Sequence, residues 1–191
     1  MSRSTRPLLN TFVCCFALAT ALLANGQAPA PAKPVAGTPV PPAQIYDKLL
    51  SMAEEDFVSA ADAMPEDKFD FAPTQGEFKG VRTFGEQIKH VTEANLYYFH
   101  DPATPLTDIR ASIDKLKTKA EIMQALKDSL AQAHTFVNAI TADNAFITLP
   151  KGGTRAGMAA TGTAHMLDHY GQMVEYLRMN GIVPPASRGS N

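Results

Sequence analysis

Two histidines, His165 and His169, lie four residues apart in a stretch with helical periodicity. On a helix this spacing places both imidazoles on one side, one turn apart. The apolar residues Met166, Met173 and Leu177 flank them, so the histidines occupy positions where a bundle helix normally carries leucine. Imidazole binds zinc, nickel, copper and iron. The pair therefore predicts two ligands of one metal ion, although two histidines at this spacing more often bind no metal.

A third histidine, His90, is expected to face inward from a separate helix. That helix begins with a capping box, Thr83 followed three residues later by Glu86. A catalytic zinc-type site needs three protein ligands and one open position, which the three histidines together would provide. Without a metal, each buried neutral ring would need both a donor and an acceptor. His90, His165 and His169 are therefore the candidate metal ligands.

Other metal sites of helical bundles do not fit the sequence. No histidine has a glutamate three residues before it, as di-iron carboxylate bundles require. The HExxH pattern of zinc proteases is also absent, because Met166 follows His165. His100 is expected in the last turn of its helix, where a cation suits the helix dipole. His134 lies off the apolar side of its helix, so neither residue is expected to be a ligand.

Several polar and aromatic residues lie near the histidine rows. Asp168, Gln172 and Glu93 could orient the imidazoles by accepting hydrogen bonds. For Asp168 and Glu93 a solvated polar surface is the favoured alternative. Tyr97 and Tyr176 are expected either to wall a pocket or simply to belong to the core.

The N-terminal segment, residues 1–26, has the layout of a secretory signal peptide. Arg3 and Arg6 precede an apolar run over residues 7–24, and small residues follow it. A retained anchor fits less well because the run is short for a membrane span. Both cysteines, Cys14 and Cys15, lie inside the run, so the mature protein has no disulfide and no thiolate ligand. We expect an exported protein, periplasmic or secreted, with no membrane contact after cleavage.

The composition after this segment is that of a globular domain. Apolar residues make up 45% of the chain and charged residues 19%. Without residues 1–26 the chain has 15 basic and 19 acidic residues, a formal charge of −4. A mildly acidic chain without a basic stripe excludes nucleic acid as the expected partner. Residues 27–42, rich in alanine and proline, are expected to be an extended linker.

Four amphipathic helices are expected, over residues 43–64, 83–100, 118–140 and 154–180. With no convincing strand and with long connections, they predict an all-α fold, a four-helix bundle over residues 43–185. Residues 186–191 are expected to be a disordered tail. Phe69, Phe71 and Phe78 are expected to hold the connection over residues 64–79 to the bundle. The predicted core positions of the first and third helices are Ile45, Leu49, Ala53, Phe57, Ala60 and Met64, and Ile122, Leu126, Leu130, Ala133, Val137 and Ile140.

Two motifs resemble the DinB-like family of metal-dependent enzymes: FGEQIKHVTEANLYYF, which contains His90, and HMLDHYGQMVEYLRMNGIVPP, which contains His165 and His169. The resemblance implies a four-helix bundle with a divalent metal, commonly zinc or nickel, held by those three histidines. Members with known activity include transferases that use small thiols, and related isomerases. Relatives often carry arginine where this chain has Tyr170. Such thiols are cytoplasmic, so an exported member is expected to use another substrate or none.

Together these features predict an exported DinB-like protein that binds one divalent metal ion. We expect a metal-dependent transferase or hydrolase acting on a small molecule, with water or a substrate atom at the open metal position. The alternative is a non-catalytic metal-binding or structural helical bundle. The sequence leaves open whether the chain is a monomer or a homodimer.

Overall fold

The computed structural model describes residues 35–103 and 110–189, and in these residues it is all helical, without a strand. This confirms the predicted all-α fold for the described residues. The predicted signal peptide and residues 27–34 of the predicted linker lie outside the described residues. The elements in order are α1 (Pro42–Ala63), η1 (Glu66–Lys68), α2 (Phe84–Tyr98), α3 (Arg110–Asp114), α4 (Lys119–Asn138), α5 (Arg155–Met179) and η2 (Pro185–Ser187).

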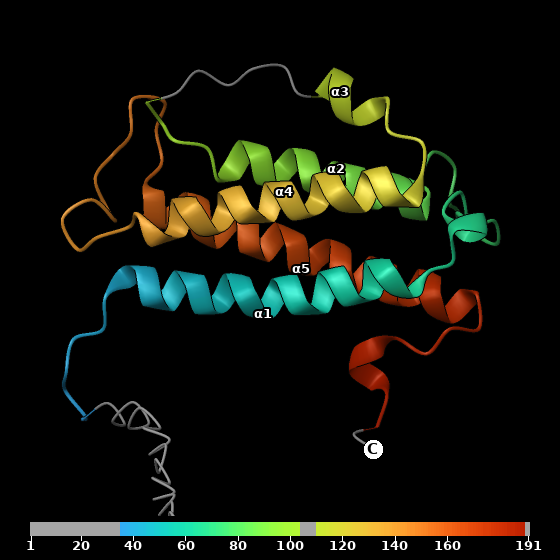
Figure 1. Cartoon of the computed structure of the whole chain (residues 1–191), viewed down its shortest axis with the longest axis horizontal. Helices are drawn as coiled ribbons and strands as arrows, with labels where there is room; N and C mark the ends of the chain where they lie inside the picture. The colour runs from blue at the N-terminus through green and yellow to red at the C-terminus, as the bar shows by residue number, and fades with distance from the viewer. Residues whose placement is uncertain (1–34, 104–109, 190–191) are drawn as a thin grey trace, which may run out of the picture. The chain divides into compact units, whose positions relative to one another are not determined.

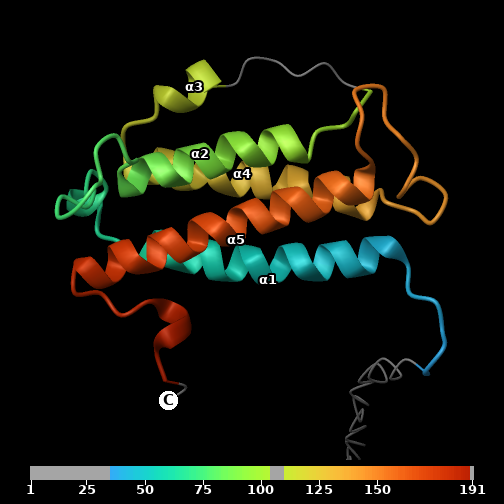
Figure 2. The same cartoon turned by 180° about the vertical axis from the view of Figure 1, so that it is seen from behind.

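The four long helices pack side by side around one core (Figures 1 and 2). Helices α1 and α2 each lie beside both α4 and α5. Figure 1 shows that α2 and α4 run in the same direction, opposite to α1 and α5. A parallel pair needs a connection that returns along the whole bundle, whereas antiparallel neighbours need only a short loop. The long connection between α2 and α4, which includes α3, meets that need.

The helix termini are set by local sequence, and the predicted capping box at Thr83 is confirmed. Thr83 and Glu86 form a reciprocal capping box at the start of α2, with the Thr83 amide 2.8 Å from a Glu86 carboxylate oxygen. Thr118 and Glu121 form the same box at the start of α4. Gly181 follows the end of α5 with φ +71°, the left-handed conformation that glycine adopts readily. These termini determine where along the bundle each side chain lies.

The predicted core is confirmed for α4 and partly wrong for α1. All six predicted α4 positions are buried, from Ile122 to Ile140. In α1, however, Ile45 and Leu49 are 46% and 47% exposed. Tyr46 and Leu50 pack inward instead. Ile45–Leu49 and Tyr46–Leu50 are adjacent rows with the same four-residue spacing, so periodicity could not choose between them.

The connection between α1 and α2 is held to the bundle by two of the three phenylalanines expected to do so. Phe69 packs edge-on against Phe84, with ring centroids 5.5 Å apart. Phe71 packs in the same way against Tyr176 of α5, at 5.7 Å. Phe78 is 37% exposed, and that part of the prediction was wrong. The first two contacts fix the segment that leads into α2.

The remaining differences are small and lie between or after the long helices. The short helix α3 lies in a stretch that we expected to be only a connector. The 3-10 turn η2 lies at the start of the expected tail and contacts α1. Among the helices of the described part, none combines the length and the apolar character that a membrane span requires.

Candidate metal centre

Helices α2 and α5 approach each other closely at Gly162, three residues before His165. A methyl group at Gly162 would lie 2.6 Å from ring atoms of Phe99 and 2.9 Å from Cβ of Tyr98. Only glycine fits there without displacing the end of α2. The close approach brings the side of α5 that carries His165 next to α2.

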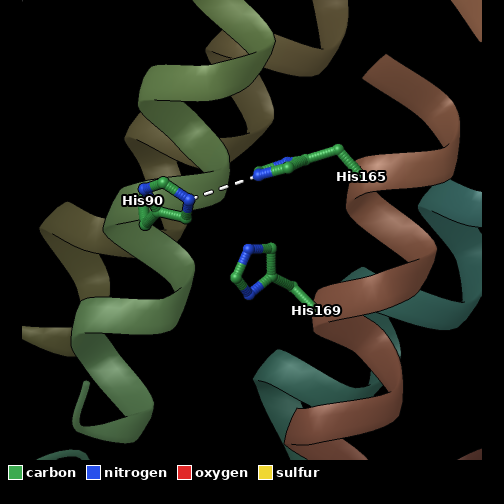
Figure 3. A group of neighbouring side chains, drawn as sticks. All are labelled: His90, His165 and His169. Carbon is green, nitrogen blue, oxygen red and sulfur yellow. Dashed lines mark hydrogen bonds between the residues drawn. The ribbon is translucent and has the colours of Figure 1, made fainter. Parts of the chain in front are cut away.

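The three predicted histidines converge across this interface. His90 projects from α2, and His165 and His169 project from α5 toward it (Figure 3). Nε2 of His90 lies 3.2 Å from Nε2 of His165. The ring centroids are 5.1 Å apart for His90 and His165, 4.8 Å for His90 and His169, and 4.6 Å for His165 and His169. One ring nitrogen from each residue lies within 4.8 Å of the other two.

This geometry suits a small divalent cation. With metal–nitrogen bonds of about 2.0–2.1 Å, tetrahedral ligands lie roughly 3.3 Å apart. The His90–His165 pair already has that spacing, and a ring nitrogen of His169 lies within 4.8 Å of both. Among the described residues, these three histidines are the group of histidine, cysteine, aspartate or glutamate side chains that lie close enough together to share one metal ion. The three histidines could therefore hold one metal ion.

A chain of hydrogen bonds fixes the orientation of His169. Its Nδ1 lies 2.7 Å from Oε1 of Gln87, an amide oxygen that can only accept, so Nδ1 carries the proton. Gln87 donates to Gln172 at 2.9 Å, and Gln172 donates to Asp168 at 3.2 Å. Nε2 of His169 is then the nitrogen with a free lone pair, the atom that a metal needs.

Burial keeps the three imidazoles neutral at physiological pH. Burial, and then the positive charge of Arg82, lower the pKa of His90 to about 4. Burial and the neighbouring histidines lower the pKa of His169 to about 4. Burial also lowers the pKa of His165, against the attraction of Asp168. Neutral imidazole is the form that binds metal, so no proton has to leave at neutral pH.

His165 differs from His169 in what surrounds its second nitrogen. Nδ1 of His165 is buried and has no hydrogen-bond partner among the described residues. Its ring lies beside Tyr98, with centroids 5.9 Å apart. A buried polar atom without a partner is costly. If Nε2 bound a metal ion, Nδ1 would carry the proton and would still lack an acceptor in the described part of the chain. Nδ1 of His165 therefore has no such hydrogen-bond partner to orient its ring, whereas Nδ1 of His169 has one in Gln87.

Gln87 was not recognised from the sequence as the hydrogen-bond partner of His169. The signal in the sequence was its spacing, three residues before His90 and so on the same side of the helix. The structure shows that Gln87 is almost fully buried, at 3% exposure. Gln172 and Asp168 were expected to accept hydrogen bonds from the imidazoles, but they are connected to His169 only through Gln87. Asp168 is exposed, in agreement with the favoured alternative of a solvated polar surface. Glu93 instead pairs with Arg110 at 3.3 Å and does not orient an imidazole.

Tyr97, Tyr176 and the two remaining histidines do not belong to the cluster. Tyr97 is 57% exposed and is not in the core, whereas Tyr176 is buried and donates to the carbonyl of Arg82 at 3.1 Å. His100 lies just after α2, with Nδ1 2.6 Å from the carbonyl of Tyr97. His134 contacts carboxylates of α1. The structure brings neither histidine to the cluster, as the sequence predicted.

A bundle of four long helices, with three inward histidines from two of them, defines the class of protein. The sequence model of the DinB superfamily matches residues 49–173, more than half of the chain, from α1 to α5. The chain belongs to the DinB superfamily, which confirms the resemblance found in its motifs. Among proteins with curated descriptions, none matches it.

Proposed function

We propose that this protein is an exported, metal-dependent enzyme of the DinB superfamily, a transferase or hydrolase that acts on a small molecule. His90, His165 and His169 would hold one divalent ion, with zinc or nickel as the favoured metals. The observation that carries the proposal is the convergence of three neutral imidazoles from α2 and α5. Residues 1–26 would be removed during export.

The arrangement of the ligands supports a reaction rather than storage. Three protein ligands leave a coordination position open, as in catalytic zinc sites. A cavity of about 430 Å³ is lined in part by His90, so a small molecule bound there would contact one of the three candidate ligands. When bound, a divalent ion would polarise an oxygen or sulfur atom of the substrate. Gln87 would hold His169 with its lone pair directed at the ion.

Metal analysis of the exported chain, purified without a histidine tag, tests the proposal. We expect about one divalent ion per chain. His165→Ala should abolish binding, because it removes one of two ligands on α5. His100→Ala is the matched control, since it removes a histidine outside the cluster and should leave the ion in place. A chain without metal, or one that keeps its ion in His165→Ala, would contradict the proposal.

Cobalt substitution separates an enzyme from a metal store. Co²⁺ at an open site should change its visible absorption when a small thiol such as 2-mercaptoethanol is added. A spectrum that no small ligand changes would indicate a closed site and favour the non-catalytic alternative. N-terminal sequencing of the exported chain tests the localisation, with a mature end expected near Gln27.

A further inference from the structure

The cavity that reaches the histidine cluster lies between the start of α2 and α3, and its lining is rich in charge. Its volume is about 430 Å³, enough for a small organic molecule. His90 belongs to both the lining and the cluster, so a molecule in the cavity lies next to the candidate metal centre. The lining consists of Gly80, Val81, Arg82, Glu86, Lys89, His90, Glu93, Arg110 and Asp114.

Most charged groups of the lining already have partners. The Glu93 carboxylate pairs with Arg110 at 3.3 Å. Glu86 accepts the Thr83 amide in the capping box, and Lys89 donates to the backbone carbonyl of Asp114 at 3.2 Å.

Arg82 is different. Its side chain is exposed and forms no salt bridge with any described residue. A guanidinium presents several donors in a planar fork that matches a carboxylate or a phosphate, and in Arg82 that fork is free to bind one.

The backbone at Arg82 is held in place rather than loose. Its carbonyl accepts a hydrogen bond from the hydroxyl of Tyr176, a buried residue of α5. The next residue, Thr83, begins α2 through its capping box. Arg82 is thus fixed between the two helices that carry the histidines.

Two arginines, Arg82 and Arg110, line the same cavity as His90. Arg110 is paired with the Glu93 carboxylate at 3.3 Å, so Arg82 is the guanidinium that remains without a carboxylate partner among the described residues. The lining has equal numbers of acidic side chains and of lysine and arginine side chains, so recognition of an anion would depend on Arg82 itself rather than on the net charge of the cavity.

We propose that this cavity binds the substrate of the metal centre through a carboxylate or phosphate group held by Arg82. The substrate class is then a small organic anion, whose charged group lies at Arg82 while its reacting part lies beside His90. This inference rests on the proposed function. Arg82 would be a binding residue that sets specificity.

Titration with succinate tests the inference, with the neutral diamide of the same skeleton, succinamide, as the matched ligand. Binding is followed by NMR, through the arginine Nε–H signals of the full chain after removal of metal by a chelator. Succinate should bind and succinamide should not. Inorganic phosphate is titrated in parallel, and the tighter of the two anions identifies carboxylate or phosphate as the preferred group.

Variants of arginine assign the effect to one side chain. Arg82→Gln should weaken anion binding about tenfold or more, the usual loss for a charge-assisted hydrogen-bonded pair. Arg82→Lys keeps the charge and should retain part of the affinity. Arg178→Gln removes the same charge from an exposed arginine outside the cavity and should have no effect.

Metal content, measured on the same samples before chelation, separates two failures. About one ion per chain, with equal succinate binding by the wild type and Arg82→Gln, would overturn this inference alone. Equal binding of succinate and succinamide would overturn it as well. A wild-type chain without metal would contradict the proposed function, on which the inference rests.

Discussion

The side-chain oxygen of Gln87, on α2, lies 2.7 Å from Nδ1 of His169, on α5, although the two residues are 82 positions apart in the sequence. Because an amide oxygen only accepts, this contact decides which nitrogen of His169 carries the proton. It also links the imidazole through Gln172 to the carboxylate of Asp168. The orientation of a candidate ligand on α5 is therefore set by a residue of α2.

We predict that Gln87→Leu weakens metal binding by about 10- to 100-fold, the usual effect of losing the hydrogen-bond partner of a ligating histidine. Gln87→Glu keeps an acceptor at the same place and should bind metal more tightly than the leucine variant. Competition titration with a chromogenic chelator measures both. Gln124→Leu is the control, since Gln124 hydrogen-bonds to Asp128 on the surface of α4. Equal affinities for all variants would refute the role of Gln87.

The close packing at Gly162 gives a prediction about stability. Gly162→Ala forces a methyl group against the ring of Phe99 and should reduce the free energy of unfolding by about 1–3 kcal/mol. Gly171→Ala lies on the same helix with no atom within 4 Å of the added methyl, and should stabilise α5 by about 0.5–1 kcal/mol. Urea denaturation at neutral pH measures both. If Gly162→Ala is as stable as Gly171→Ala, the helices do not approach as closely as described.

His134 should make stability depend on pH. Its two ring nitrogens each lie 2.7 Å from a carboxylate oxygen, one of Asp47 and one of Glu54. Burial alone would lower the pKa of His134, but these hydrogen bonds and charges raise it above 6.5. A raised folded-state pKa means that the stabilisation is complete below about pH 6.5 and is lost as the pH rises through the folded value.

We therefore expect the wild type to have a higher free energy of unfolding than His134→Gln. The difference should be largest at about pH 5.5–6.5 and smallest in mildly alkaline solution. The groups are partly exposed, so the change should be about 1 kcal/mol or less. Thermal or urea unfolding of both proteins across this pH range measures it. A difference that stays constant with pH would show that the imidazole is not charged between the carboxylates.

The contact between Tyr176 and Arg82 gives a further prediction. Tyr176→Phe removes the hydrogen bond to the carbonyl of Arg82, so the free energy of unfolding should fall by about 0.5–1.5 kcal/mol. Tyr97→Phe is the matched control, because Tyr97 is largely exposed and should tolerate the change. Denaturant unfolding compares the two. Equal stabilities would indicate that the hydroxyl does not hold the backbone of Arg82.

Local sequence determined much of this protein. The capping boxes at Thr83 and Thr118 and the glycine at position 181 were readable because each acts through neighbouring backbone groups. The spacing of His165 and His169 fixed their common side of a helix, for the same local reason. Periodicity also identified the buried side of α4, where one apolar row is unbroken. In α1, two adjacent rows competed, and only packing selected Tyr46 and Leu50.

The tertiary structure decided which helices are neighbours, and that adjacency determines which residues form the site. The spacing of residues does not show that α2 lies beside α5, because that adjacency depends on how the long helices pack around the core. Yet His90 meets His165, and Gln87 meets His169, only across that interface. The backbone of Arg82 is likewise held against α5 by a hydrogen bond from Tyr176. Residue types and helix faces follow from local backbone rules, whereas contacts between distant helices follow from how the whole core packs.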